Sequence, residues 1–406
     1  MAVSRQIRAE VDEILPGIIA DRRWLHENPE LGFEETKTAE FVRQRLESLG
    51  VEDIRTGIAK TGVTGLVRGT ADGPGKTVLL RADMDALPID EENDVDYKSQ
   101  TEGVMHACGH DGHTAMLLGV ARLLMERRDQ FSGNVKLLFQ PSEEAYGGGA
   151  KPMIEAGVLE DPHVDAVFGQ HLLSHMPVGT IWITGGPVQA SADMFKIRIQ
   201  GKGGHGAMPH GTVDPIQIAM QIGTALQTIV SRNVDPMEQV VVSVCNIHAG
   251  KADNVIPDTA ELGGTVRTFT PENRDLAERR MKEIATGIAA SMGGSAEVRY
   301  TRGYPPTVND DAMADLVWDA AVKVVGEENV HKMTPMMPAE DFSYFLEERP
   351  GTYFMTGCGN EEKGIVWPHH HPRFDIDEDA FQFGVATMVQ TVLDYLGSTE
   401  TGTTNG

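Results

Sequence analysis

Residues 78–89 have the sequence Val-Leu-Leu-Arg-Ala-Asp-Met-Asp-Ala-Leu-Pro-Ile, in which a short apolar run leads directly into a polar segment. A brief run of branched apolar residues bounded in this way predicts a buried β-strand. Two more runs have this form: Val135–Phe139 precedes Gln-Pro-Ser-Glu-Glu, and Ala166–Phe168 precedes Gly-Gln-His. Helical stretches such as Ala115–Met125 separate the runs, and this alternation predicts an α/β layered domain.

The polar segments after these runs are expected to form one site. Open α/β sheets bind their ligands just beyond the C-terminal ends of the strands. The residues placed there by the three runs include Asp83, Asp85, Glu143, Glu144 and His171.

A change of pattern marks an inserted domain. Between Pro187 and Arg302 the strands alternate or are rich in β-branched residues, as in Phe195–Ile199 and Val240–Val244, and a helix begins near Pro215. We therefore expect a split catalytic domain, residues 1–186 and 303–406, with a mixed sheet and flanking helices. Residues 187–302 are expected to form a smaller α+β lid, or dimerisation-type, domain.

Bulk properties limit the classes of protein. The chain has 406 residues, too many for one compact core, and contains no apolar run of about 18 residues that would span a membrane. Lys and Arg total 35 against 60 Asp and Glu, so the formal charge of −25 argues against nucleic acid and anionic membranes as partners. The first 20 residues lack a secretory apolar stretch, and the three cysteines, Cys108, Cys245 and Cys358, are too few for a disulfide framework. The cytoplasm is the expected location.

The densest group of chemically active side chains is His106–His113, with the sequence His-Ala-Cys-Gly-His-Asp-Gly-His. Two glycines loosen the backbone, so that Cys108 and His110 can face one point. A divalent cation lowers the pKa of a thiol from its usual value of about 8.5, and imidazole is a common ligand of such ions. A metal site is the hypothesis, and a loop of surface histidines is the alternative.

Glu143 and Glu144 form an adjacent pair directly after a predicted strand. Neighbouring carboxylates repel each other, so one of them would ligate a metal while the other acts as a base. The alternative is an exposed acidic turn that caps the next helix. His171 has the same two interpretations.

A third cluster, Trp367–Phe374, places three histidines between prolines ahead of the last helix. Because the run is internal and flanked by aromatic residues, at least one of its histidines is expected to be a metal ligand.

Four motifs follow one another along the chain: Arg81–Ile89, His106–His113, Pro141–Glu144 and His370–Phe374. In this order they resemble the aminoacylase and hippurate hydrolase branch of the carboxypeptidase G-like metallopeptidases. The similarity runs from Arg22–His26 to the final helix. It implies a two-metal site, with Glu143 as general base, in which this branch uses Cys108 where more distant relatives use a bridging carboxylate. The implied ligands are Cys108, His110, Glu144, His171 and His370.

The same resemblance implies roles for residues around this site. Asp85 would orient a ligand histidine, because metal-bound imidazoles usually need such a partner. His370 matches the family pattern, although His369 or His371 could take its place after a small shift of the loop. His106 and His113 are expected to lie behind the ligands or to pack.

Three residues of the insert also match the family. The resemblance implies that His205 holds the reacting carbonyl oxygen, often at a neighbouring subunit's site, while Asn254 and Arg267 contact the substrate. Glycines and prolines near His205 could instead only shape hairpins, and Arg267 could only pair with a surface acid near Glu261.

The predicted activity is hydrolysis of the amide bond of N-acyl amino acids, of N-acetyl or N-benzoyl type, in a homo-oligomer such as a dimer or a dimer of dimers. Two divalent ions, manganese, zinc, cobalt or nickel, would assist it. The alternatives are a dipeptidase, aminopeptidase or carboxypeptidase with the same chemistry, and a noncatalytic metal-binding protein. Glu143, an acid with no structural need beside a ligand, argues against the noncatalytic protein.

Overall fold

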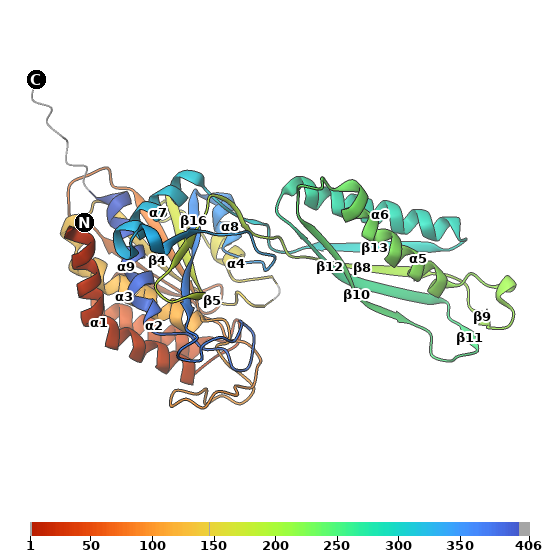
Figure 1. Cartoon of the computed structure of the whole chain (residues 1–406), viewed down its shortest axis with the longest axis horizontal. Helices are drawn as coiled ribbons and strands as arrows, with labels where there is room; N and C mark the ends of the chain where they lie inside the picture. The colour runs from red at the N-terminus through yellow and green to blue at the C-terminus, as the bar shows by residue number, and fades with distance from the viewer. Residues whose placement is uncertain (1, 146, 398–406) are drawn as a thin grey trace, which may run out of the picture. The chain divides into compact units, whose positions relative to one another are not determined.

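A computed structural model describes residues 2–145 and 147–397 of the chain, with side chains from residue 6 onward. They form two compact units (Figure 1). Unit 1 comprises the chain up to Val188, Val308–Thr334 and the chain from Asp341 onward. Unit 2 comprises Gln189–Thr307 and Pro335–Glu340.

Unit 1 is built on an eight-stranded mixed sheet in the order β1-β2-β4-β3-β5-β16-β6-β15. The mixed α/β architecture predicted from the sequence is confirmed. The central strands β4, β3, β5 and β16 run parallel, whereas β1 and β2 pair antiparallel at one edge. The strands are β1 (Glu52–Ile58), β2 (Gly62–Arg68), β3 (Thr77–Asp83), β4 (Asn134–Gln140), β5 (Ala166–Pro177), β6 (Ile181–Ile183), β15 (Val330–Lys332) and β16 (Gly351–Gly359), and β7 (Gly186–Gln189) pairs separately with β14 (Thr307–Asn309).

Helices cover this sheet, and α1, α3 and α9 pack against one another (Figure 1). Helix α3 is buried along almost its whole length, and Gly112 explains how closely it approaches the sheet. A Cβ atom at Gly112 would lie 2.6 Å from Leu172 Cδ1 on β5, so a larger residue would push on the Leu172 side chain. The helices are α1 (Ala2–Glu27), α2 (Thr36–Leu49), α3 (His110–Glu126), α4 (Ala150–Glu155), α7 (Asp311–Val325), α8 (Ser343–Glu348) and α9 (Ala380–Leu396), with short 3₁₀ turns η1 (Arg128–Gln130) and η4 (Glu327–Asn329).

The parallel central strands bring the predicted polar segments to one edge. Asp83 at the end of β3 is level with Gln140 at the end of β4. On the other side of β3, Arg81 is level with Gly169, which places His171 beside Asp83. His171 lies within β5 and not after it as predicted, because β16 pairs with β5 as far as Pro177 and lengthens the strand.

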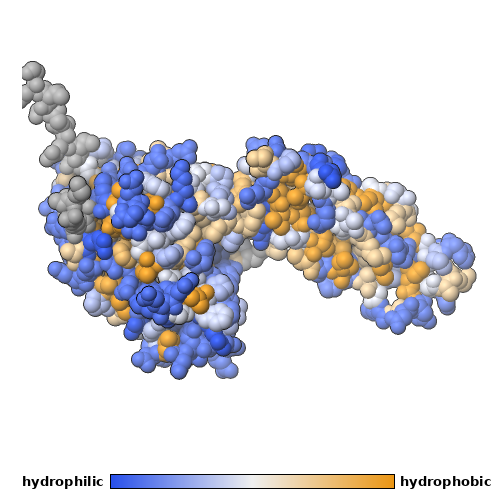
Figure 2. All heavy atoms as spheres, viewed as in Figure 1, coloured by the Kyte–Doolittle hydropathy of each residue, from blue (hydrophilic) through white to orange (hydrophobic). Residues whose placement is uncertain are grey.

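Unit 2 is a four-stranded antiparallel sheet in the order β10-β12-β8-β13, packed against helices α5 and α6 (Figure 1). Alternate residues of β8 are buried, as expected for a sheet with one covered face. Figure 2 shows apolar side chains reaching the surface of this unit. Its elements are β8 (Asp193–Gln200), β9 (Gly204–His205), η2 (Pro209–Gly211), α5 (Pro215–Thr228), the π-helical turn η3 (Ile229–Asn233), β10 (Val240–Ala249), β11 (Val255–Ile256), β12 (Thr259–Thr268), α6 (Pro271–Ser291) and β13 (Ser295–Arg302).

The boundaries of unit 2 differ from those expected for the insert, which were residues 187–302. The unit continues to Thr307 and takes in Pro335–Glu340. The second segment joins because the Ala190 backbone N–H donates to the carbonyl oxygens of Met336 (3.0 Å) and Pro338 (3.2 Å). Sequence patterns cannot predict such a pairing between loops more than a hundred residues apart.

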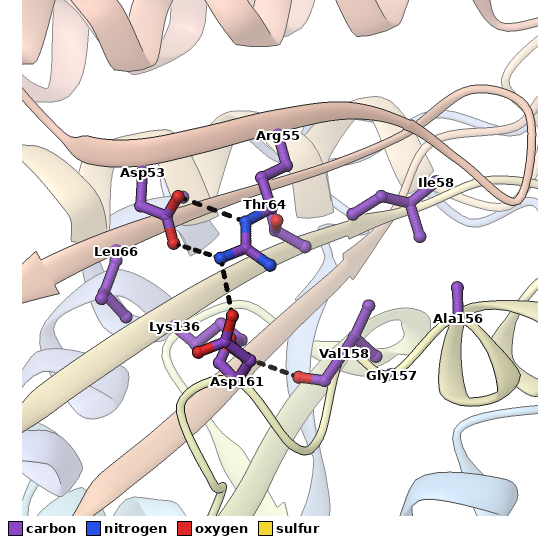
Figure 3. Close-up of a pocket in the computed structure, with 11 residues that line it drawn as sticks. Asp53, Arg55, Ile58, Thr64, Leu66, Lys136, Ala156, Gly157, Val158 and Asp161 are labelled. Atoms are coloured by element: carbon purple, nitrogen blue, oxygen red, sulfur yellow. Dashed lines mark hydrogen bonds and ion pairs between the residues drawn. The ribbon is translucent and has the colours of Figure 1, made fainter.

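A buried lysine ties β4 to the loop that leads into β5. The Lys136 ammonium donates to the carbonyl oxygens of Val158 (2.6 Å) and Asp161 (2.7 Å), so it is held by backbone groups. Beside it, the Arg55 guanidinium bridges the carboxylates of Asp53 and Asp161 (Figure 3). This cluster therefore links β1 and β4 to the loop that precedes β5. None of the described helices is both long and apolar enough to cross a bilayer.

Candidate metal centre

The loop before α3 presents the first two candidate ligands. Gly109 has φ 90°, a conformation that favours glycine, and is followed at once by the first residue of α3, His110. The turn points the Cys108 thiol toward β5, where its Sγ lies 3.5 Å from His171 Nε2. All three side chains are buried, with exposures of 8% for Cys108, 1% for His110 and 8% for His171.

His110 is oriented by Asp85. One Asp85 oxygen lies 3.2 Å from His110 Nδ1, and the other accepts the Glu144 backbone N–H at 2.9 Å. His110 Nε2 is buried and has no hydrogen-bond partner in the described chain, although Asp83 Oδ2 (3.7 Å) and Glu144 Oε1 (4.0 Å) lie near it. An unpartnered buried imidazole nitrogen surrounded by carboxylates suits a cation.

The three histidines of Trp367–Phe374 have different surroundings. His370 has φ 63°, its backbone N–H donates to Ala107 O (2.8 Å), and its Nε2 lies 3.0 Å from Glu144 Oε1. His369 is turned inward, where its Nε2 accepts the Ser174 backbone N–H at 3.3 Å. His371 stacks on Trp367, with ring centroids 4.3 Å apart. Of the three, His370 is therefore the one whose ring nitrogen lies beside Glu144.

These side chains form overlapping sets of possible metal ligands, each with its donor atoms within 4.8 Å of one another. Cys108 belongs to two sets, one with His110 and His171 and one with Glu144 and His370. A further set contains His110, Glu143 and Glu144. The donors are of the types that zinc and related divalent ions prefer, and a shared sulfur suits two neighbouring ions.

The ionisation of Cys108 is set by burial and by the acids around it. Burial, together with the carboxylates of Glu144, Glu143 and Asp83, raises the pKa of the thiol well above its usual range. Without a cation the sulfur therefore keeps its proton at neutral pH, and a bound divalent ion would supply the charge that stabilises the thiolate.

The pKa values of His110 and His171 are shifted in opposite directions. Burial lowers the pKa of His110, but the carboxylates of Asp83, Asp85 and Glu144 outweigh it and raise that pKa to about 10. Burial, with neighbouring histidines, holds the pKa of His171 well below its usual range. His171 is thus neutral and able to ligate, whereas His110 carries the proton that a metal ion would displace.

His113 and His106 lie behind these residues. His113 Nδ1 is 2.6 Å from Asp83 Oδ1, and its Nε2 accepts the Leu172 backbone N–H at 2.9 Å. His113 therefore braces the backbone next to His171. His106 is buried, neither ring nitrogen has a hydrogen-bond partner among the described residues, and burial lowers its pKa to about 4.

Of the predicted site residues of unit 2, His205 and Asn254 lie close together, and Arg267 lies apart from them. His205 on β9 is exposed, and the Asn254 carbonyl oxygen accepts the backbone N–H of the next residue, Gly206, at 2.8 Å. Arg267 lies on β12, donates to Thr265 Oγ1 and to Val266 O, and forms no ion pair with a described carboxylate. The alternative of an ion pair with an acid near Glu261 is therefore wrong for the described chain.

The length of β12 separates these residues. Arg267 follows Thr259 by eight positions on an extended strand, or about 26 Å. Thr259 lies at the end of the four-stranded sheet that is next in the chain to the separate β9–β11 pair, where His205 and Asn254 lie, whereas Arg267 lies at the end where the chain enters unit 2. Asn254 and Arg267 were both expected to contact the substrate, but within a single chain they lie too far apart to hold the same carboxylate, because a strand of this length lies between them.

Sequence reasoning missed two groups of buried charges. Arg22 and His26, one turn apart on α1, contact Asp111 Oδ2 at 2.8 Å and 2.7 Å and so anchor the start of α3. Two polar residues four positions apart on an apolar helix face were the available signal. Glu35 also contacts the site, but its partner Ser142 lies 107 positions away, so no local pattern marks it.

Comparisons with known proteins agree with this geometry. The family described as Peptidase family M20/M25/M40 matches residues 79–394. An N-acyl-L-amino acid amidohydrolase from Geobacillus stearothermophilus is 49% identical over 306 residues, covering 75% of this chain and 81% of the relative. Thermostable carboxypeptidase 2 from Saccharolobus solfataricus is 46% identical over 387 residues, covering 95% and 96%. The crystal structure of YXEP from Bacillus subtilis, titled a dinuclear metal binding peptidase from the M20 family, has a TM-score of 0.83 and 36% identity, covering 95% of this chain and 99% of that one.

The brace provided by His113 predicts a measurable effect on metal binding. His113→Leu removes the acceptor of the Leu172 N–H and the partner of Asp83, and should weaken affinity for a divalent ion by about 10- to 100-fold. Competition with a chromophoric chelator measures this affinity. The exposed His163→Leu is the matched control and should bind as wild type does. Unchanged affinity in His113→Leu would contradict the bracing role.

Proposed function

Because this chain belongs to peptidase family M20/M25/M40 and is a metal-dependent amidohydrolase, we propose that it cleaves the amide bond of N-acyl amino acids to give a carboxylic acid and a free amino acid. The family predicted from the sequence is confirmed by this membership. The observation that carries the proposal is the pair of ligand sets that share Cys108, with Glu143 beside them.

In this proposal two divalent ions are held by the five donors that the sequence predicted. They are Cys108, His110, Glu144, His171 and His370. The relative titled a dinuclear metal binding peptidase supports two ions, and manganese, zinc, cobalt or nickel all accept such donors. When bound, the ions acidify water and polarise a carbonyl group.

Glu143 is the proposed general base. It is 7% exposed, and its carboxylate lies in the same ligand set as His110 and Glu144. Glu143 would take a proton from the attacking water and return it to the departing amine. A protein that used its ions only to brace the fold would need no acid at this place, which argues against the noncatalytic alternative.

Arg267 is the proposed contact for the α-carboxylate of the substrate. It is half-buried and forms no ion pair with a described carboxylate, and a guanidinium binds a carboxylate through two parallel hydrogen bonds. Such a contact also suits a carboxypeptidase, which cleaves next to a free C-terminus. The carboxypeptidase name of the Saccharolobus solfataricus relative makes this the second candidate.

We further propose that the protein works as a homo-oligomer. Arg267 lies at one end of the four-stranded sheet, and His205 lies on the separate β9–β11 pair beyond its other end, so His205 of one chain would complete the site of another. The edge strand β10 is a suitable interface, because residues 245–249 are exposed and include Ile247, which is 54% exposed.

The three cysteines are free, which is consistent with the cytoplasm.

The base assignment predicts a loss of rate without a loss of metal. Glu143→Gln should lower kcat for an N-acetyl amino acid by about 10²- to 10⁴-fold, because an amide cannot take the proton. Metal content, measured by elemental analysis, should remain that of wild type. Glu144→Gln is the comparison, and it should lose metal as well as activity. Near-normal turnover by Glu143→Gln would refute the assignment.

The substrate class predicts a difference between acids and amides. Arg267→Ala should raise KM or lower kcat/KM for N-acetyl and N-benzoyl amino acids far more than for their α-amide analogues, because only the acids carry the recognised charge. Dipeptides assayed alongside separate the carboxypeptidase alternative. Equal losses on acids and amides would rule out carboxylate recognition by Arg267.

The oligomer predicts complementation between two inactive variants. His205→Ala and Glu143→Gln should each lose activity, since one lacks the proposed oxyanion donor and the other the base. After subunit exchange, a mixed dimer contains one site with both residues intact, so activity should return to about a quarter of wild type for equal mixing and two sites per dimer. Failure to recover despite proven exchange would contradict a site shared between chains.

A further inference from the structure

Glu35 is a buried acid at an unusual place. It is the N-cap residue of α2, where a capping side chain accepts a hydrogen bond from the first turn of the helix. Here the side chain makes no capping hydrogen bond, and the residue is fully buried with an exposure of 0%. A buried carboxylate needs partners, so its two oxygens must be satisfied elsewhere.

Both oxygens bind groups outside α2. Glu35 Oε1 accepts the Ser142 backbone N–H at 2.8 Å, and Oε2 accepts the Thr61 hydroxyl at 2.6 Å. Ser142 immediately precedes Glu143 and has φ 56°, a left-handed conformation that a non-glycine residue rarely adopts. A charge-assisted hydrogen bond to its N–H holds the backbone in this conformation.

The segment Glu30–Glu35 also packs against the same turn. A Cβ atom at Gly32 would lie 2.6 Å from Ser142 Oγ and 3.1 Å from Ser142 Cα. A few residues earlier, Glu30 O accepts the Ala86 backbone N–H at 2.8 Å, directly after Asp85. The segment therefore lies against both loops that carry the carboxylates of the site.

Glu143 thus lies between two backbone N–H groups that are each held by a carboxylate. Asp85 accepts the Glu144 N–H at 2.9 Å and also contacts His110, so it positions two of the proposed metal ligands. Glu35 holds the Ser142 N–H, and its side chain hydrogen-bonds to none of the five proposed ligands. The two acids therefore have separable effects.

We infer that Glu35 is a positioning residue for Glu143: by holding the Ser142 backbone it fixes where the Glu143 carboxylate meets the attacking water. This inference rests on the proposed function, in which Glu143 is the base. A displacement of the base by about 1 Å is enough to lower a rate by up to about 10²-fold, so the effect should be kinetic and should not involve the metal.

The test compares three single variants. Glu35→Met keeps the length of the side chain and removes the acceptor, so kcat should fall by about 10- to 100-fold, with KM and metal content unchanged. Glu35→Gln keeps an oxygen for the Ser142 N–H and can donate to the Thr61 hydroxyl, so it should retain most of the wild-type kcat. Glu34→Met, at the exposed neighbouring position, is the matched control and should behave as wild type.

A double-mutant cycle separates positioning from a merely structural role. If Glu35 acts through Glu143, adding Glu35→Met to Glu143→Gln should cause no further fall in kcat, because the group being positioned is already absent. An equal fall in both backgrounds, or loss of metal in Glu35→Met, would overturn the inference. Full activity of folded Glu35→Met would also overturn it.

Gly32→Ala provides an independent route if Glu35→Met does not fold. Gly32 does not have a positive φ, so alanine is tolerated by its backbone but pushes on Ser142. The same loss of kcat, and its absence in the Glu143→Gln background, is expected, and an equal loss in both backgrounds would refute the inference. High activity of Glu143→Gln alone would instead refute the proposed base, whereas an inactive Glu143→Gln with a fully active Glu35→Met would refute only the role of Glu35.

Discussion

The constraint on which the site depends is the burial of acidic groups at one edge of a sheet. Asp83, Asp85, Glu143 and the Cys108 thiol are all less than a tenth exposed, and the Glu144 carboxylate lies among them. Such groups are costly to bury unless positive charge or hydrogen bonds compensate them. Arg81 pairs with Asp83 at 2.6 Å, but the ligand sets around Cys108 contain imidazoles and acids only. Divalent cations supply the positive charge that offsets these buried acids. The fold, the ionisation of the ligands and catalysis therefore all depend on the same bound ions.

Three left-handed backbone positions shape this edge. Gly109 (φ 90°), Ser142 (φ 56°) and His370 (φ 63°) each lie in a loop that delivers proposed ligands or the base. Such conformations persist only where the surroundings enforce them. Gly109 adopts this conformation without strain because it has no side chain. The Ser142 N–H donates to Glu35 Oε1 (2.8 Å), and the His370 N–H donates to Ala107 O (2.8 Å). The loops are thus fixed by interactions between distant segments, and their side chains meet because the backbone is already in place.

The sequence was informative where chemistry and periodicity coincide. Apolar runs ending in polar segments predicted the strands β3, β4 and β5, and the motif around Cys108 predicted a cluster that the structure brings together. The apolar run before His171 could not show that His171 lies within β5, because the pairing with β16 that lengthens this strand is a tertiary contact. The separation of Asn254 from Arg267 follows from the length of β12, an extended strand of 10 residues between them.

The most direct test of the account is anomalous diffraction at the metal absorption edge from crystals of active, zinc-loaded or manganese-loaded protein. We expect two neighbouring peaks in unit 1, with Cys108 Sγ as a shared ligand at about 2.3 Å in the zinc form. His110 and His171 should surround one peak, and Glu144 and His370 the other. Crystals of fully active protein without metal at this cluster, or with metal bound only elsewhere, would contradict it.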